Sequence, residues 1–196
     1  MELIIIIGII VLLTVLVIGI YNRLVRLRNR VEAAWAQIDV QLKRRHDLVP
    51  NLVETVKGYA AHERETLEAV IKARQQAVSA GGVENQAQAE NMLTGALRQL
   101  FAVSEDYPDL KANENFLALQ EELSKTEERI AFSRQFYNEQ TLAYDNSLET
   151  FPSNIVAGMF NFEEKPYFET EEATRTAPSV DFGTTAAPPP EPGVTP

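Results

Sequence analysis

An uninterrupted apolar segment close to the amino terminus constrains the fold of this chain more than any other feature. Residues 3–21 carry no charged side chain, and no other run of this length and character occurs in the sequence. At about 1.5 Å per residue, a helix of this length matches the roughly 30 Å hydrocarbon core of a bilayer. The sequence therefore predicts a single transmembrane helix over residues 3–21.

The charges that flank this segment predict its orientation. Only residues 1–2 precede it, and neither is basic, whereas a cluster of arginines follows it directly. Because basic residues next to a span tend to stay in the cytoplasm, we expect residues 1–2 outside and the rest of the chain inside. The arginines are also candidate contacts for anionic lipid headgroups, each contributing about 1 kcal/mol near the surface; a purely topogenic role is the alternative. The cluster consists of Arg23, Arg26, Arg28 and Arg30.

A cleaved secretory signal is the alternative interpretation of the apolar segment. Signal peptides begin with basic residues and have a shorter apolar core, of about 7–15 residues. This chain has neither feature, although Val17 and Gly19 resemble a small-residue cleavage site. The basic cluster after the segment also opposes export, so we favour the transmembrane helix.

Composition limits the classes of function. The formal net charge of -10 argues against a general affinity for nucleic acid, and we expect no nucleic-acid partner. The sequence contains no cysteine. This removes disulfides, thiolate catalysis and cysteine-ligated zinc.

Beyond the span, apolar residues recur at spacings of three and four, which is typical of amphipathic helices. Nothing between Tyr21 and Asn22 breaks a helix, so we expect the span to continue into the first soluble helix as one rod. Asp47 can cap a new helix and Pro50 suits a first helical turn, which predicts a break there. The four expected helices cover residues 24–42, 50–79, 84–104 and 115–150.

Four amphipathic helices with short connections pack most economically as an antiparallel up-and-down bundle. The expected fold class is therefore all-α, with a single transmembrane helix followed by an antiparallel up-and-down four-helix bundle over residues 22–168. In this arrangement the fourth helix runs back toward the membrane. Residues 169–196 are acidic and rich in proline, a composition that predicts a disordered tail.

The segment after the fourth helix, residues 151–162, combines aromatic and aliphatic side chains and carries no charge. Because the fourth helix returns, we expect this segment near the bilayer. Two placements remain open, namely contact with the membrane interface and a cap over the open end of the bundle. The candidate interface residues are Phe151, Ile155, Met159, Phe160 and Phe162.

The sequence offers no recognisable set of reactive residues. A carboxylate-bridged metal site in a helical bundle uses Glu-x-x-His pairs, but Lys43 and Tyr59 stand three residues before the two histidines, His46 and His62. His62 and Glu63 begin a metallopeptidase-like motif that lacks its second histidine. We therefore assign no catalytic, cofactor or metal-ligating residue and expect no enzyme. An enzyme or metal-binding bundle with an unrecognised carboxylate site is the alternative from another class.

Several motifs are spaced along the chain, from the span to about Phe168. They include RHDLVPNLV at residues 45–53, YPDLKA at 107–112, FYN at 136–138 and FPSNIVAG at 151–158. Together these motifs resemble the LemA family of bacterial membrane proteins. The resemblance implies an anchor in the inner membrane with a short external amino terminus, a cytoplasmic antiparallel helical bundle and no enzyme activity.

The resemblance also implies associations. One branch of the family takes part in forming the magnetosome membrane. Other members are encoded near a membrane metallopeptidase, which makes such a protein a candidate partner. The family has no accepted catalytic residues to carry over.

These observations favour a non-catalytic, single-span membrane protein that serves as a scaffold or interaction module at the inner leaflet. Its expected partners are membrane lipids and proteins, copies of itself included. A candidate partner-facing patch, at the expected membrane-distal tip, consists of Arg44, Arg45 and Asp47. The alternative is a self-assembling protein that organises or shapes the membrane through the arginine cluster and residues 151–162.

Overall fold

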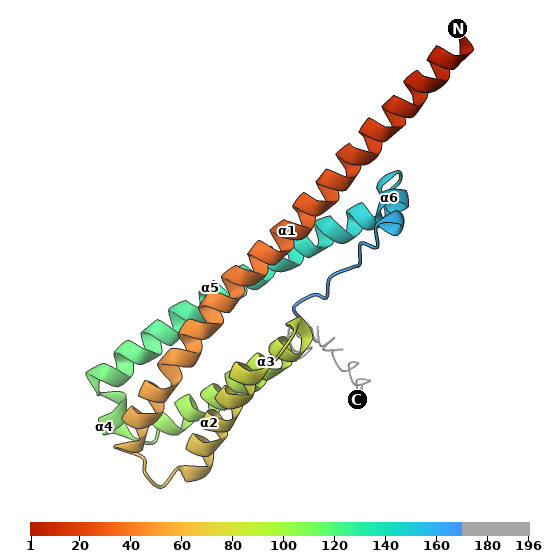
Figure 1. Cartoon of the computed structure of the whole chain (residues 1–196). Helices are drawn as coiled ribbons and strands as arrows, with labels where there is room; N and C mark the ends of the chain where they lie inside the picture. The colour runs from red at the N-terminus through yellow and green to blue at the C-terminus, as the bar shows by residue number, and fades with distance from the viewer. Residues whose placement is uncertain (170–196) are drawn as a thin grey trace, which may run out of the picture.

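The computed structural model describes residues 1–169, and all regular structure within this range is α-helical. This confirms the predicted all-helical class. Apart from Glu169, the predicted tail of residues 169–196 lies outside the described residues. The helices are α1 (Glu2–Lys57), α2 (Arg64–Ser79), α3 (Val83–Ser104), α4 (Pro108–Lys111), α5 (Glu114–Glu149) and α6 (Ser153–Met159) (Figure 1).

The predicted span continues without a break into the domain, because α1 is one helix of 56 residues. At 1.5 Å per residue this is a rod roughly 84 Å long. Its first part projects beyond the other helices (Figure 1). An 18-residue window of this helix has a mean hydropathy of 3.5 and is 0% buried. Such a surface is compatible with lipid and unfavourable in water.

The predicted break between Asp47 and Pro50 is wrong, since α1 continues through Pro50 to Lys57. Proline in a helix interior costs about 3 kcal/mol. Pro50 itself is exposed, but an apolar stripe around it is buried, and burial of each such side chain contributes about 1.5–3 kcal/mol. The stripe consists of Val49, Leu52, Val53 and Val56.

A neighbouring helix replaces the hydrogen bond that the proline removes. Because Pro50 has no N–H group, the carbonyl oxygen of His46, four residues earlier, loses its helical donor. Arg74 of α2 donates its Nε–H to this oxygen at 2.7 Å. The chain therefore turns only at residues 58–63, later than the sequence predicted.

The later helices begin and end close to their predicted bounds, whereas α2 begins at Arg64 and not at Pro50. Gly82, which precedes α3, has a φ of 79°, in the region that favours glycine. Asn113 caps α5, because its side-chain oxygen accepts a hydrogen bond from the N–H of Phe116 at 3.0 Å.

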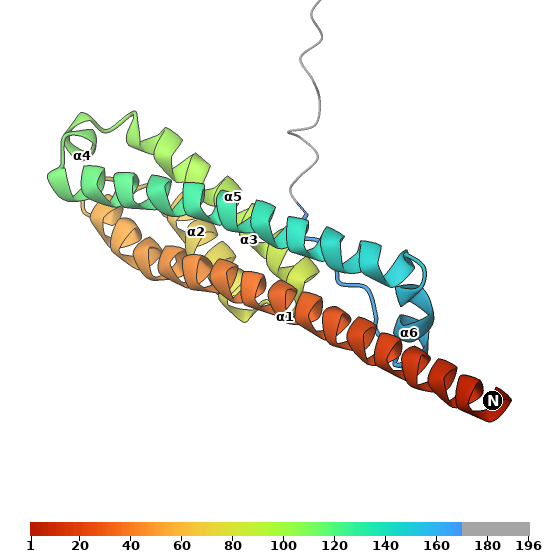
Figure 2. The same cartoon turned by 90° about the horizontal axis from the view of Figure 1, so that it is seen from above.

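Two pairs of helices form the domain. α1 and α5 run side by side (Figure 2), α2 pairs with α3, and α1 also packs on α2. One hydrophobic core, at the end far from the span, includes side chains from all of α1, α2, α3, α4 and α5. A second core lies mainly between α1, α5 and α6. α3 and α5 are not a close pair, so a regular four-helix bundle is not established. The structure shows a long α1–α5 pair flanked by the shorter α2–α3 pair.

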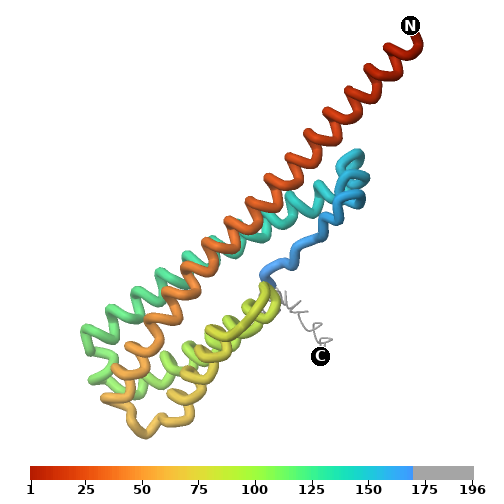
Figure 3. Tube along the Cα trace, in the orientation of Figure 1, coloured from red at the N-terminus to blue at the C-terminus, as the bar shows by residue number. Residues whose placement is uncertain are grey.

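After α6 the chain runs back along α5 without regular structure (Figure 3). We call residues 163–169 the returning segment. Phe168 anchors it in the second core, where its side chain is 1% exposed. Side chains of α5 bind its backbone through four hydrogen bonds: Lys165 N–H to Asp145 Oδ1 at 3.3 Å, the Tyr137 hydroxyl to the Pro166 carbonyl at 2.7 Å, Phe168 N–H to Asn138 Oδ1 at 2.9 Å, and Asn138 Nδ2 to the Phe168 carbonyl at 3.2 Å.

Candidate functional site

The end of the domain nearest the span brings together most of the predicted lipid-contact residues. α6 packs against both α1 and α5 at this end (Figure 1). The ring centroids of Phe160 and Phe162 lie 4.8 and 5.6 Å from that of Tyr21, the last residue of the predicted span. Residues 160–162 therefore contact α1 at the point where it leaves the span.

The four arginines after the span differ in their surroundings. Arg28 is half-buried, and its guanidinium carbon lies 5.6 Å from the centroid of the Phe162 ring, within cation–π range. Arg23, Arg26 and Arg30 are exposed. Three arginines are thus accessible to anionic headgroups, whereas Arg28 contacts the Phe162 ring after α6. Their contact with lipid stays a prediction.

α6 has one buried face and one exposed face. Val156 and Ala157 are buried against α1 and α5. On the other side, Ile155 and Met159 are 55% and 66% exposed, and Phe151, just before the helix, is 75% exposed. The buried face suits the predicted cap, and the exposed face suits the predicted membrane contact. The geometry is therefore compatible with both placements at once.

The structure does not assemble the predicted partner patch. Because α1 continues to Lys57, Arg44, Arg45 and Asp47 lie about three turns before its end and not at the distal tip. Arg45 is 3% exposed, and Arg44 forms an ion pair with Glu122 of α5. Only Asp47 is exposed without a described partner. The two arginines serve contacts between helices of this chain.

Sequence reasoning missed a buried polar network around Glu90 of α3. Oε1 of Glu90 lies 2.6 Å from Nε2 of His46 and accepts a hydrogen bond from Nε2 of Gln86 at 2.9 Å. Its other oxygen, Oε2, lies 3.4 Å from Nη1 of Arg45. Nη2 of Arg45 also donates to the Thr94 hydroxyl at 2.7 Å. The network thereby ties α1 to α3.

The same network extends to α5. Nη1 of Arg45 lies 3.1 Å from Oε2 of Glu127, and Nη2 of Arg134 lies 3.9 Å from Oε1 of that glutamate. Burial lowers the pKa of Arg134, an effect that the Glu127 charge opposes. A sequence signal for the network existed, because Glu90 stands on the apolar stripe of α3, three residues before the buried Leu93.

The structure keeps the two histidines apart. His46 is bound to Glu90, and His62 is exposed in the turn after α1. Within residues 1–169, no group of three or more histidine, aspartate or glutamate side chains lies close enough together to hold a metal ion. The most distinctive assembly in this range is the apolar span with the arginines and α6 beside it.

An exposed apolar helix that continues into an all-helical domain, with a second apolar surface folded back beside it, defines a membrane-associated helical protein. The sequence model of the LemA family matches residues 34–182. Because this match covers more than half of the chain, the protein belongs to the LemA family, as its motifs predicted. We expected the resemblance to run from the span to about Phe168, whereas the match begins after the span, at residue 34, and runs past Phe168.

Individual relatives agree with this assignment. The chain is 28% identical over 178 residues to Protein LemA of Metamycoplasma hominis, covering 84% of this chain and 80% of the relative. It is 26% identical over 182 residues to Magnetosome protein MamQ 2 of Paramagnetospirillum magneticum, covering 80% of this chain and 67% of the relative. Magnetosome protein MamQ of Magnetospirillum gryphiswaldense is 24% identical over the same length and coverage.

Proposed function

We propose that the protein is a non-catalytic, single-span protein of the bacterial inner membrane whose cytoplasmic domain is an interaction module held against the inner leaflet. The observation that carries this proposal is the contact of Phe160 and Phe162 with Tyr21. Tyr21 ends the span, so this contact keeps α6 within reach of the bilayer surface. The domain is thus attached at two points, through α1 and through α6.

The exposed face of α6 supports this placement. Phe151, Ile155 and Met159 present apolar surface beside the span, and covering apolar surface contributes about 25 cal/mol per Å². Lipid provides that cover in the interface region. The exposed Arg23, next to the end of the span, suits the anionic headgroups at the same depth.

The absence of cysteine allows a direct test of this placement. Met159→Cys in the full-length protein is labelled with an environment-sensitive fluorophore and reconstituted into vesicles of phosphatidylethanolamine and phosphatidylglycerol. We expect quenching by lipids that carry a quencher at the headgroup. The matched control is Ile71→Cys on α2, which is 51% exposed but far from the span. Equal quenching at the two positions would contradict the proposal.

The interaction role needs a test in intact cells. A photo-crosslinking amino acid is placed singly at the exposed positions Ile71, Val78 and Met92, on α2 and α3. An interaction module gives discrete protein adducts at one or more of these positions, and the family association makes a membrane metallopeptidase one candidate. Adducts to lipid alone, or none above background at every position, would count against the module.

Membrane organisation by self-assembly is a second candidate function. It is favoured by the apolar face of α6 and by relatives that are named magnetosome proteins. The purified full-length protein should then associate into oligomers and change the shape of vesicles. The triple variant Phe151→Ala, Ile155→Ala, Met159→Ala should lose the shape change while keeping its helical content. A monomeric protein that leaves vesicles unchanged argues against this candidate.

A further inference from the structure

An open groove separates α3 from α5. The two helices are not a close pair, and the space between them measures about 340 Å³. Leu97 and Phe101 of α3 and Leu123 of α5 give it apolar walls, and Arg98 and Glu127 add charge. Among the described residues, no segment fills this groove.

The returning segment leads toward the groove. Its successive contacts on α5 pass from Asp145, which binds Lys165, to Asn138, which binds both backbone groups of Phe168. The guanidinium carbon of Arg134 then lies 5.5 Å from the centroid of the Phe168 ring. The chain therefore advances toward the amino terminus of α5.

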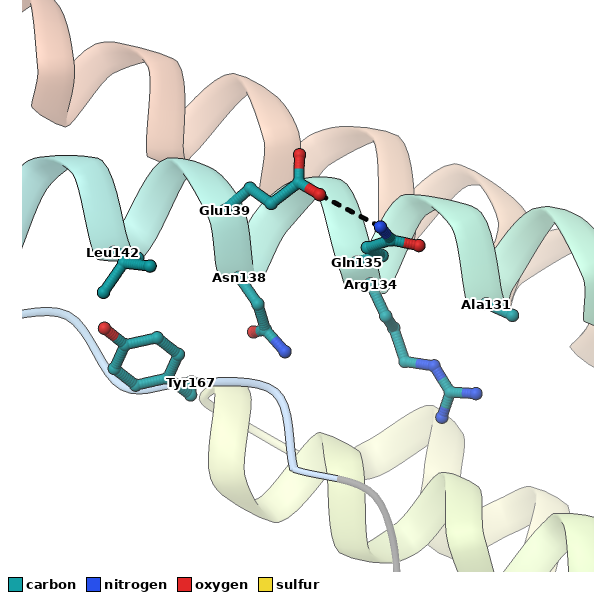
Figure 4. Close-up of a pocket in the computed structure, with 7 residues that line it drawn as sticks. All are labelled: Ala131, Arg134, Gln135, Asn138, Glu139, Leu142 and Tyr167. Atoms are coloured by element: carbon teal, nitrogen blue, oxygen red, sulfur yellow. Dashed lines mark hydrogen bonds between the residues drawn. The ribbon is translucent and has the colours of Figure 1, made fainter. Parts of the chain in front are cut away.

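The returning segment and the groove lie on the same face of α5. Figure 4 shows Arg134 and Asn138 projecting from α5 toward the end of this segment, with Tyr167 beside them. These three residues help to line a hollow of about 500 Å³. Glu127 precedes Arg134 by seven residues, and Leu123 precedes Glu127 by four. Such steps place side chains in one row along a helix.

The distance can be spanned by a few residues. Arg134 and Leu123 are eleven residues apart on α5, which corresponds to about 16 Å along the helix axis. An extended chain advances about 3.3 Å per residue and needs about five residues for this distance. Counted from Phe168, five residues correspond to position 173 of the sequence.

Charge favours the residues that come next. Arg98 is exposed and has no ion-pair partner within residues 1–169. Arg134 shares Glu127 with Arg45, which binds that carboxylate more closely, at 3.1 Å against 3.9 Å. Residues 170–175 have the sequence TEEATR and so bring two adjacent carboxylates, followed by a single arginine at position 175. They also lie inside the family match, which extends to residue 182.

We propose that residues 170–175 of the same chain continue the returning segment into the groove between α3 and α5, where the carboxylates of Glu171 and Glu172 supply the negative charge that the exposed Arg98 lacks among the described residues. The groove is then a binding site for an extended acidic peptide, and the chain's own tail is its occupant. Another protein that uses this groove has to displace the tail first. The inference goes beyond the proposed function, because it assigns an internal competitor to one surface of the domain.

Disulfide trapping in the cysteine-free, full-length chain tests the proposal. Ala173→Cys is paired with Ser124→Cys, which lines the groove, or with the neighbouring exposed Lys125→Cys, which does not. Both pairs have the same tail position and the same tether length, so chance encounters affect them alike. If the tail occupies the groove, the cysteines at positions 124 and 173 should form an intramolecular disulfide about tenfold faster than those at positions 125 and 173. The reason is the higher effective concentration of the first pair of thiols.

Charge reversal supplies the second arm. In the Ser124 pair, Arg98→Glu should slow disulfide formation, and adding Glu171→Arg with Glu172→Arg should restore the rate. Circular dichroism confirms that each variant keeps its helical content. Equal rates for the Ser124 and Lys125 pairs overturn the proposal. A mainly intermolecular product also overturns it, because a second copy would then be the occupant.

Discussion

Glu90 is the residue on which the contacts between α1 and α3 converge. Its carboxylate is 2% exposed and meets His46 and Arg45 of α1. A buried carboxylate is costly unless it is paired and hydrogen-bonded. No local rule predicted these pairs, because the partners lie about 45 residues apart in the sequence and meet only after the helices pack. The motif around Arg45 and His46 is visible in the sequence, but the contact of these two side chains with Glu90 is visible only in the structure.

Replacing Glu90 should therefore destabilise the domain strongly. Glu90→Ala leaves the buried Arg45 without one carboxylate partner, and loss of one member of a buried ion pair typically costs about 3–5 kcal/mol. The measurement is chemical denaturation of the full-length protein in detergent, followed by circular dichroism. Glu128→Ala is the matched control, because Glu128 is exposed in the middle of α5, and it should change the free energy of unfolding by less than about 0.5 kcal/mol. Similar values for the two variants would contradict the assigned role.

Tyr137 predicts how stability responds to alkaline pH. Burial raises the pKa of Tyr137, so the folded state favours the protonated hydroxyl, which donates to the Pro166 carbonyl at 2.7 Å. A folded pKa above the unfolded value, about 10 for tyrosine, means that this stabilisation is complete below pH 10. It is lost as the pH rises through the folded pKa.

Tyr137→Phe separates the two effects of this hydroxyl. At neutral pH the variant should lose about 1 kcal/mol of stability, because the hydrogen bond to the returning segment is gone. Above about pH 10 its stability should fall less steeply than that of the parent protein. Denaturant unfolding at several pH values measures both quantities, and tyrosinate absorbance reports the titration. Parallel pH curves for the two proteins would exclude Tyr137 as a source of the alkaline loss.

At the scale of the helices, the sequence predicted what depends on nearby residues. α3 and α5 begin one residue from their predicted starts, because apolar spacing is a local signal. The predicted break at Pro50 failed for the same reason. Asp47 and Pro50 are local signals for a new helix, but burial of the neighbouring stripe and the hydrogen bond from Arg74 come from other helices.

The pair Pro50 and Arg74 gives a prediction about α1. Arg74→Met removes the donor to the His46 carbonyl and should cost about 1 kcal/mol. Pro50→Ala restores a backbone N–H at this carbonyl and should stabilise the protein, since alanine is favoured over proline inside helices by up to about 3 kcal/mol. In the Pro50→Ala background the cost of Arg74→Met should shrink. A double-mutant cycle of unfolding free energies measures this coupling, and strictly additive effects would show that the two residues act independently.

At the scale of the whole molecule, the sequence predicted the span, the helical class and the return of residues 151–162 toward the end of the span. The return was predictable because successive helices of an antiparallel bundle alternate in direction. The fourth helix therefore runs back toward the membrane. The groove between α3 and α5 was not predictable in this way. It arises because α3 pairs with α2 and not with α5, and pairing partners are set by side-chain packing over the entire core.

Orientation in the membrane is a property of the whole chain, and the arginine cluster predicts it. The exposed Arg23, Arg26 and Arg30 follow the span directly, whereas Glu2 precedes it. By the tendency of basic flanks to stay inside, the amino terminus should be external and the domain cytoplasmic. A single cysteine at Glu2→Cys should therefore react with a membrane-impermeant maleimide in intact cells.

The matched position for this test is Ala61→Cys, which is exposed in the turn between α1 and α2. It should react only after the cells are opened, because the continuous α1 carries this turn to the far end of the domain. The parent chain has no cysteine and supplies the background. The reverse pattern would place the domain outside and the arginine cluster against the external leaflet. Loss of the Glu2→Cys label together with a shorter chain would instead identify the apolar segment as a cleaved signal, since α1 would then begin after residue 19.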